Sequence, residues 1–334
     1  MKKRRTDLNL DENQIKFAKA KKIIILMMSI SLLIFLVIAF VAVLNEGLSK
    51  FVLSILSINP FYFLISILVI FLGYVMRYPK WELYLKRLGI RIKRNTNFMI
   101  YLSMYSMDMT PGRWGRGVVA YTVNRITKTK FGKVLPAVIA DNFTDFLGFA
   151  VLSLIMAFLV NKYLDVSLFI TFLLLIPFLF LFNKKPFEFV KSRFGHIRFL
   201  RGFFKEGLLY FKNVHYLGLD VYLYSMIYTI PSMFMNGLAL YFVILSTGIT
   251  LGISAIPVVV FIYTSSLLIG VITGIPGALG VTDTALISYL LVFFSSSGID
   301  FGMASLITIL FRIVSLWFVE GFGFASLIYT LKYW

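Results

Sequence analysis

The stretch that decides the fold is DMTPGRWGRG, residues 108–117. It is a charged turn broken by proline and glycine, and it follows an apolar run, residues 98–107, that is too short to cross a bilayer. A second turn of this kind, GIPGALGVTD at residues 274–283, interrupts apolar sequence late in the chain. Two broken segments in corresponding places suggest a transport site rather than ordinary loops. The turn-forming residues are Pro111, Gly112 and Gly115 in the first stretch and Pro276, Gly277 and Gly280 in the second.

The composition around these turns is that of a membrane protein. Of 334 residues, 59% are hydrophobic and 14% are charged, so the apolar runs must face lipid. The 33 Lys and Arg residues exceed the 15 Asp and Glu residues, and most of them lie in short loops between apolar segments. Anionic lipid headgroups therefore explain the basic charge better than nucleic acid does. Because the chain has no cysteine, it has no disulfide, thiolate metal site or cysteine nucleophile.

The apolar runs predict an all-α polytopic membrane protein. About six full spans are expected, at residues 23–44, 60–75, 134–160, 166–182, 217–246 and 301–331. Residues 98–126 and 256–294 are expected to form re-entrant hairpins that enter from opposite faces, in an inverted-repeat-like arrangement. For the second of these segments, two ordinary helices joined by a short inner loop remain the alternative.

Loop charge predicts the orientation of the chain. Residues 1–22 form a basic tail, and residues 183–215 form a basic loop. By the positive-inside rule both are cytoplasmic, as are both termini, in the cell membrane. Residues 45–58 contain a single lysine and are expected to be an external loop. Residues 23–334 then form one membrane domain.

Two arginines lie at the first broken turn. Each turn precedes a helical stretch, and the free N–H groups and partial positive charge of a helix start favour an anion such as a phosphate. Arg113 and Arg116 are three residues apart at the first such start, where two guanidinium groups would bind phosphate oxygens. The positive-inside rule alone also accounts for arginines at a cytoplasmic end, so both interpretations remain open.

Two carboxylates interrupt the apolar run at residues 134–160. Asp141 and Asp145 are four residues apart and so lie on one face of a helix. A carboxylate in hydrocarbon costs roughly 2.5 to 3.5 kcal/mol, so both should point inward. They are candidates for an ion or proton site, or for salt bridges to Arg113 or Arg116.

The last span also contains charges. Arg312 needs an acidic partner or an anionic ligand, and the candidate partners are Asp283, Asp145 and Glu320. Glu320 lies eight residues after Arg312, on roughly the same side of a helix, and is a further candidate for ion coupling. Asp283 follows the second turn, where it either contacts a ligand or caps the helix that begins there.

Several catalytic patterns are absent from the sequence. It has no G-x-x-x-x-G-K-[ST] phosphate loop, no H-E-x-x-H and no G-x-S-x-G. We therefore assign no catalytic residue, metal or cofactor, and we expect the chain not to be an enzyme.

These motifs resemble a flippase-like family of membrane proteins that includes the transmembrane region of lysylphosphatidylglycerol synthases. Residues 110–115 are similar to its early Pro-Gly-x-x-Gly element, and residues 276–283 to its later Pro-Gly-Gly-Leu-Gly-x-x-Glu element. Residues 141–145 resemble its Glu-Arg-x-x-Asp run, and Arg312 falls where the family has an arginine in its last helix.

The chain also departs from the family pattern. Ala278 replaces a glycine, Asp141 and Asp283 each replace a glutamate, and Asn142 replaces an arginine. The sequence ends at Trp334, so we do not expect the soluble aminoacyl-transferring domain of the full synthases, nor lysyl transfer to lipid.

The resemblance implies movement of a lipid with a polar headgroup, a phospholipid or a polyprenyl-linked lipid, between leaflets. We expect a groove between the two hairpins that is lined by Arg113, Arg116, Asp145, Asp283 and Arg312, with Asp141, Asp145 and Glu320 as candidates for ion or proton coupling. The alternatives are an ion-coupled carrier of a small soluble anion and a membrane-embedded transferase acting on a lipid-linked substrate.

Overall fold

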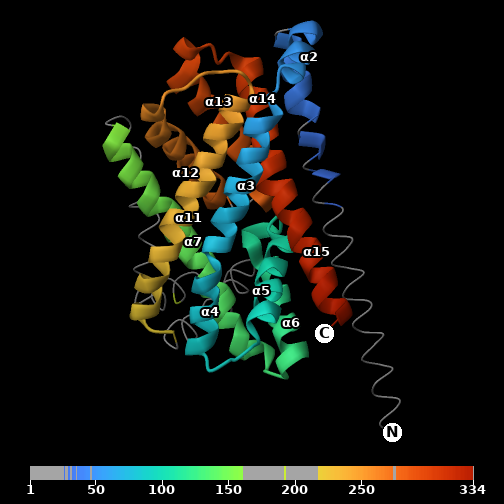
Figure 1. The fold of residues 1–334 in the computed structure, drawn as a ribbon, viewed down its shortest axis with the longest axis vertical. Helices are drawn as coiled ribbons and strands as arrows, with labels where there is room; N and C mark the ends of the chain where they lie inside the picture. The colour runs from blue at the N-terminus through green and yellow to red at the C-terminus, as the bar shows by residue number, and fades with distance from the viewer. Residues whose placement is uncertain are drawn as a thin grey trace.

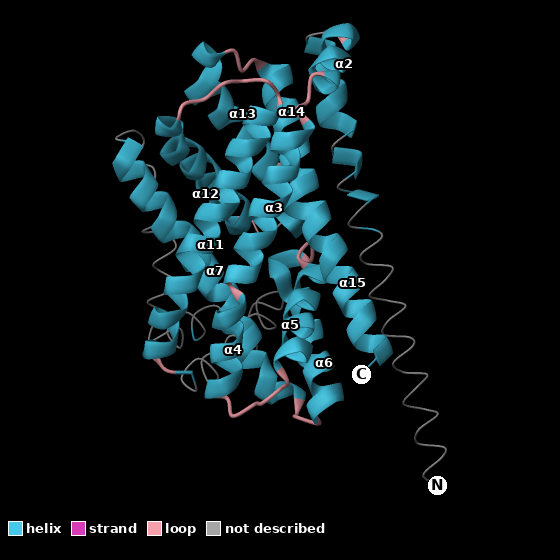
Figure 2. Cartoon of the chain, viewed as in Figure 1, coloured by secondary structure: helices cyan, strands magenta, loops and turns pink. Residues whose placement is uncertain are grey.

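The computed structural model describes residues 26, 29–30, 32–34, 36–45, 47–160, 192, 217–273 and 276–333. Over these residues the secondary structure is helical and contains no strand (Figures 1 and 2), which confirms the all-α prediction. The helices that are long and apolar enough to cross a membrane are Pro60–Arg87, Phe131–Val160, Leu219–Ser246, Ile253–Gly270 and Phe301–Lys332. A sixth candidate span is the pair Leu32–Asn45 and Leu48–Leu56, which is bent by 118°.

Most of the predicted spans in the described part of the chain correspond to long helices. They are α3 (Pro60–Met76) continued by α4 (Tyr78–Arg87), α7 (Phe131–Val160), α11 (Leu219–Ser246), and a last helix made of α14 (Phe301–Arg312), η6 (Ile313–Trp317) and α15 (Phe318–Tyr333). The predicted span at residues 166–182, the basic loop at 183–215 and the basic tail at 1–22 lie outside the described residues.

The predicted external loop at residues 45–58 is not irregular, because it contains helix α2 (Leu48–Leu56). Its external position stays a prediction. Its apolar residues recur at helical spacing, and Phe51 is buried. Lys50, which suggested a loop, extends from this helix to Asp300, with 2.5 Å between Nζ and the carboxylate.

Both predicted breaks are present. In the first, α5 (Arg94–Ser103) and the 3₁₀ turn η1 (Met104–Met107) lead to the 3₁₀ segment η2 (Pro111–Gly117) and α6 (Val118–Thr127). In the second, α12 (Ile256–Ile272) is followed by η4 (Pro276–Ala278) and α13 (Val281–Phe294).

The two arms of each broken segment are in contact, and the turns η2 and η4 contact each other. Figure 1 shows α6 towards the lower end of the bundle and α13 towards its upper end. The α12 arm, counted from Ile253, is long enough to span a membrane, whereas α13 is shorter. Re-entry of these segments into a membrane therefore stays a prediction.

Local backbone and packing requirements explain the glycines of the two turns. A Cβ atom on Gly115 would lie 2.6 Å from the Cβ of Met107, so no larger residue fits. The N–H of Gly115 donates to the Thr110 hydroxyl at 2.8 Å. Gly277 and Gly280 have φ values of 61° and 80°, a conformation that costs glycine little.

The last helix packs closely against the first broken segment. A Cβ atom on Gly323 would lie 2.5 Å from the backbone nitrogen of Ser106, so the two backbones touch. Directly after Arg312 the helix winds as a π-helix, η6, before α-helical winding resumes at Phe318. Such segments are wider than an α-helix and change the direction in which later side chains point.

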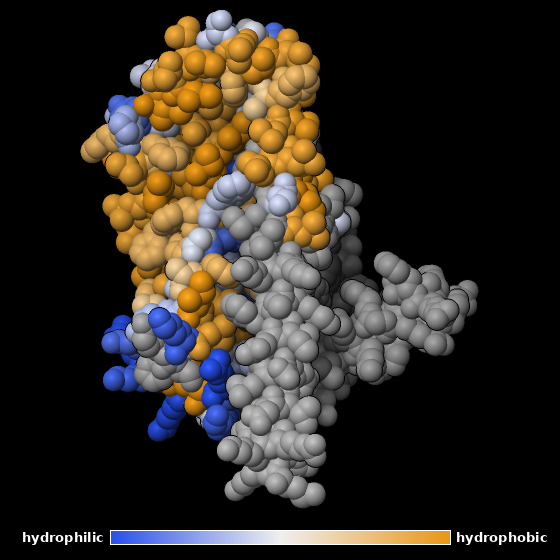
Figure 3. Space-filling model, turned by 90° about the vertical axis from the view of Figure 1, so that its right-hand side faces the viewer, coloured by the Kyte–Doolittle hydropathy of each residue, from blue (hydrophilic) through white to orange (hydrophobic). Residues whose placement is uncertain are grey.

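The surface separates into an apolar region and a basic end. Figure 3 shows hydrophobic residues over the upper and middle part of one side, and hydrophilic residues gathered at the lower end. Large apolar side chains such as Phe61, Leu64 and Leu223 are exposed along α3 and α11, as expected for a surface that faces lipid. Exposed basic residues lie in α4, at the start of α5 and in α6, at the end of the molecule where the C-terminus also lies (Figure 1).

Candidate functional site

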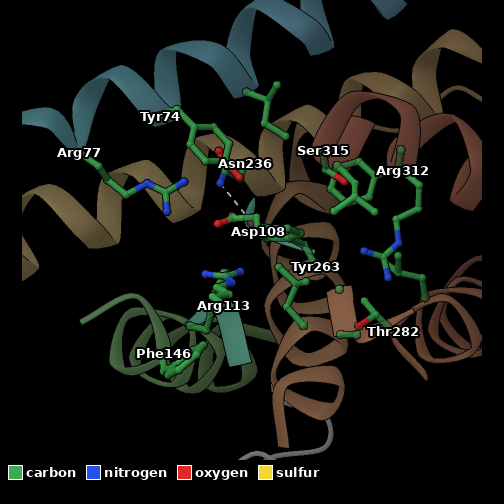
Figure 4. A pocket seen from close by; sticks show the side chains of 18 of the residues that line it. Tyr74, Arg77, Asp108, Arg113, Phe146, Asn236, Tyr263, Thr282, Arg312 and Ser315 are labelled. Carbon is green, nitrogen blue, oxygen red and sulfur yellow. Dashed lines mark hydrogen bonds between the residues drawn. The ribbon is translucent and has the colours of Figure 1, made fainter. Parts of the chain in front are cut away.

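The two broken turns meet at a cavity of about 80 Å³. Its walls come from α3, the η1–η2 turn, α7, α11, α12, α13 and the last helix (Figure 4). A cavity needs roughly 10 to 15 Å³ to hold one water, so this one has room for several. The polar residues that line it are Tyr74, Arg77, Asp108, Thr110, Arg113, Asn236, Tyr263, Thr282, Arg312 and Ser315.

A network of charged side chains lies beside and behind this cavity. It consists of four cations and three carboxylates, which we call the charge network: Arg77, Lys80, Arg113, Arg116, Asp108, Asp141 and Asp145. Arg113 has a side chain that is 18% exposed, whereas those of the other members are at most 8% exposed. Such a cluster is stable among apolar helices only if its charges are paired.

Asp145 is the centre of the charge network. Its carboxylate lies 3.2 Å from Arg77 and 2.7 Å from Lys80. It also lies 3.3 Å from Arg113 and 3.1 Å from Arg116. Four cations therefore share one carboxylate, and the removal of one of them leaves Asp145 paired.

Arg116 is surrounded by carboxylates. Its Nε and Nη2 atoms donate to the two oxygens of Asp108 at 2.5 and 2.8 Å. Its Nη1 atom donates to Asp141 at 3.0 Å and to Asp145 at 3.1 Å. Asp141 also lies 3.0 Å from Lys80. Arg116 thus holds η2 against α7, and its nitrogens are already occupied by protein groups.

The charge network contains four cations and three carboxylates. Arg77, which is incompletely paired, lines the cavity. Arg77 stacks over the ring of Tyr74 at 4.3 Å, but its Nε and Nη2 atoms have no hydrogen-bond partner in the described part of the chain. A buried N–H group without a partner is costly. An anion or water in the cavity would satisfy these donors.

A second arginine faces the cavity from the other side. The Nε atom of Arg312 donates to Asp283 at 2.5 Å, while its Nη2 atom has no partner among the described residues. Figure 4 shows Arg312 on the side of the cavity opposite Arg77 and Arg113. The second oxygen of Asp283 accepts the N–H of Gly280 at 2.8 Å. Asp283 therefore both caps α13 and pairs with Arg312.

Glu320 has a different neighbour from the one that the sequence suggested. One oxygen of Glu320 accepts the N–H of Met109 at 2.8 Å, and the other has no hydrogen-bond partner among the described residues. Arg312 contacts α13, whereas Glu320, two helical turns further along, contacts the turn that follows η1. Glu320 is therefore not the partner of Arg312.

Residues 28–323 match the family model described as the lysylphosphatidylglycerol synthase transmembrane region. The chain belongs to this family. The resemblance seen in the motifs is thus confirmed over most of the chain, and together with the long apolar helices it makes the protein a multi-pass membrane protein of a lipid-related family. No curated protein matches the chain significantly.

In this family member, the predicted site residues separate into two groups. Arg113 and Arg312 line the cavity. Asp283 pairs with Arg312 at its edge, while Arg116, Asp141 and Asp145 lie behind the cavity wall in the charge network. The cavity therefore has cations on two sides and carboxylates behind its wall.

Sequence reasoning missed three members of this site: Arg77, Lys80 and Asp108. The first two follow a long apolar run and flank Pro79, which suggested the end of a span. Proline is tolerated in the first turn of a helix, so α4 continues from α3 and both cations lie inside a 28-residue span. The available signal was the cost of a buried cation. Asp108 begins the first broken turn, and its pairing with Arg116 was not predicted from the sequence.

Proposed function

We propose that this protein moves a lipid with an anionic, phosphate-bearing headgroup between the leaflets of the cell membrane. The supporting observation is that Arg77 and Arg312, each with N–H groups that have no partner among the described residues, face one cavity from opposite sides, where two broken helices meet among apolar ones. Membership of a lipid-related family supports a lipid as the cargo.

The free-energy cost of moving an ionised group through hydrocarbon explains why such a cavity suits a lipid headgroup. A bare ionised group moved through hydrocarbon meets a barrier far above thermal energy. Irregular backbone at membrane depth is tolerated where it lines a wet cavity, and the two turns provide such backbone. In this proposal the headgroup passes the cavity, while its chains remain beside the exposed apolar faces of α3 and α11.

Arg113 is the cation best placed to bind the headgroup. It lines the cavity and is the most exposed member of the charge network. When it turns to a phosphate, Asp145 keeps Lys80, Arg77 and Arg116 as partners. Arg113 can therefore change partners without leaving a buried carboxylate unpaired.

Coupling to protons is part of the proposal, with Asp141, Asp145 and Glu320 as candidates. Asp141 and Asp145 are paired with cations. Glu320 has no cation within ion-pair distance among the described residues, and one of its oxygens has no hydrogen-bond partner there. Glu320 is therefore the one of the three carboxyl groups that no ion pair in the described part of the chain holds, which makes it the best of the three. We also propose that the basic end faces the cytoplasm.

A leaflet-accessibility assay tests the function. The purified protein is reconstituted in vesicles that contain a fluorescent phosphatidylglycerol, and an impermeant reductant reports how fast the lipid exchanges without nucleotide. We expect Arg312→Gln to slow exchange roughly tenfold or more, because one charge-assisted hydrogen bond contributes about 1.5 to 3 kcal/mol. Arg91→Gln, at an exposed arginine, is the matched control and should leave exchange unchanged.

Two further results would contradict this function. One is unchanged exchange in both Arg312→Gln and Arg113→Gly. The other is equal exchange of fluorescent phosphatidylcholine, whose net charge is zero. Chromatography of the recovered lipid checks that no new product forms, as expected for transport rather than group transfer.

The small size of the cavity favours one alternative, a carrier of a soluble anion. About 80 Å³ suits a group of phosphate size, whether or not it is attached to a lipid. Uptake of radiolabelled inorganic phosphate into the same vesicles distinguishes the two. Uptake without lipid exchange would replace our proposal with this alternative.

A further inference from the structure

A second concave site lies at the basic end, away from the cavity. It is a groove of about 570 Å³ between the junction of α3 with α4, the start of α5 and the end of α15. We call it the basic groove, and its lining residues include Lys93, Arg94, Thr96, Phe98, Met99 and Tyr329. None of them belongs to the charge network.

The polar side of the basic groove is the start of α5. Lys93 is the N-cap residue of this helix and Arg94 its first residue, and both side chains are exposed. Neither has a carboxylate within ion-pair distance among the described residues. No acidic residue lies in the first turn. Two cations at the positive end of a helix repel its dipole, so this arrangement is unfavourable without a bound anion.

Free hydrogen-bond donors lie at the same place. The first intrahelical bond of α5 joins the N–H of Asn97 to the carbonyl of Lys93 at 2.8 Å. The three preceding N–H groups therefore have no partner within the helix. Thr96 is 4% exposed and lines the groove, and its hydroxyl makes no hydrogen bond within the described part of the chain. An unpartnered hydroxyl that lines the groove is available to a ligand or water there.

The other side of the groove is apolar. Val75, Phe98, Met99 and the ring of Tyr329 line it. Apolar residues beside a pair of cations match a molecule with an anionic head and a hydrocarbon tail. A free phosphate would use only one side of this groove, and a zwitterionic lipid would gain less from the two cations.

We propose that the basic groove binds an anionic phospholipid. Its phosphate accepts hydrogen bonds from the start of α5 and from Thr96 and pairs with Lys93 and Arg94, and one acyl chain lies along Phe98, Met99 and Tyr329. The site is distinct from the cavity, and α5 and η1 connect the two, since η1 is followed directly by Asp108.

Photolabelling of the full chain tests this site. The protein is reconstituted in phosphatidylcholine vesicles that contain a phosphatidylglycerol with a photoreactive acyl chain, and the labelled peptides are identified by mass spectrometry. We expect labels at Phe98, Met99 or Tyr329. Unlabelled phosphatidylglycerol should compete, whereas phosphatidylcholine and free glycerol phosphate should not.

Substitutions give the deciding comparison. The double variant Lys93→Gln with Arg94→Gln should reduce groove labelling roughly tenfold, because it removes the two positive charges that attract an anionic headgroup. Thr96→Val should reduce it by a few-fold. Arg125→Gln with Lys130→Gln is the control, because these exposed basic residues lie at the same end but do not line the groove, and labelling should not change.

Several results would overturn the proposal. They are equal labelling in the Lys93/Arg94 variant and the control, equal competition by phosphatidylcholine, or labels that avoid the groove. Because both substituted cations are exposed, the double variant should fold, and its thermal unfolding is compared with that of the control. Labelling does not require transport, so failure here leaves the proposed function standing, and failure of transport leaves this site standing.

Discussion

The two broken turns are built alike in sequence but are held very differently. Arg116 in η2 is bound to three carboxylates, and these connect the turn to α7 and, through Lys80, to α4. The second turn is followed by one ion pair, between Asp283 on α13 and Arg312 on α14. A motion at the first turn must break several buried pairs, whereas a motion at the second must break one. We therefore expect the second turn to be the moving part of a transport cycle.

Arg116→Ala should have the largest effect on stability. It leaves Asp108 with no cation in the charge network and weakens the pairing of Asp141 and Asp145, so we expect a loss of about 3 to 5 kcal/mol in the free energy of unfolding. Unfolding in detergent, followed by circular dichroism, measures it. Arg125→Ala, at an exposed arginine in α6, should change nothing. If the two variants are equally stable, the first turn is not held by its ion pairs.

Asp283→Asn should have a smaller effect, about 1.5 to 3 kcal/mol. The amide keeps an oxygen that can accept the N–H of Gly280, and only the pair with Arg312 is lost. The same unfolding measurement applies, with Asp220→Asn in an exposed pair with Arg87 as control. A loss as large as that of Arg116→Ala would remove the difference between the two turns.

Gly323→Ala tests how the last helix supports the first turn from behind. The added methyl group would lie 2.5 Å from the backbone nitrogen of Ser106, so we expect a loss of about 1 to 3 kcal/mol from overpacking. Gly321→Ala is the matched control on the same helix, since its Cβ meets nothing within 4 Å. That variant should be neutral or more stable by up to about 1 kcal/mol. Equal behaviour of the two would mean that the close contact with η1 is not required.

Arg113→Gly should have the smallest effect on stability. A partly exposed ion pair contributes about 0 to 1 kcal/mol, and glycine relieves the backbone of a residue with φ 58°. We expect a net change within about 1 kcal/mol, together with slower lipid exchange. Arg113→Ala loses the same pair without that relief and should be the less stable of the two. A loss of several kcal/mol in the glycine variant would place Arg113 among the structural cations.

Much of the site follows from the cost of burying charge. That cost predicts partners for Asp141, Asp145 and Arg312, and the structure supplies them from Arg116, Lys80 and Asp283. The same rule, applied to Arg77 and Lys80, would have predicted that these two cations also belong to the site. The positive-inside rule offered a simpler explanation for two cations after an apolar run, and Pro79 suggested that the helix ended there.

Other features depended on tertiary packing. Helix α2 lies in a short segment that loop charge assigned to the outside, and its pairing with Asp300 joins residues far apart in sequence. The π-helical winding between Arg312 and Glu320 was not predicted, because no residue type in Ile313–Trp317 indicates it. A regular period of 3.6 residues was the only available assumption.

The π-helix η6 gives the last helix two partners at once. Before it, Arg312 contacts α13; after it, Gly323 packs against η1 and Glu320 contacts the turn that follows η1. If the same five residues, Ile313–Trp317, wound as an ordinary α-helix, everything after them would be rotated by roughly 100°. One half of the helix would then face the wrong neighbour. The π-helical turn therefore fixes the rotation of one half of the helix relative to the other, and so allows each half to contact its own broken segment.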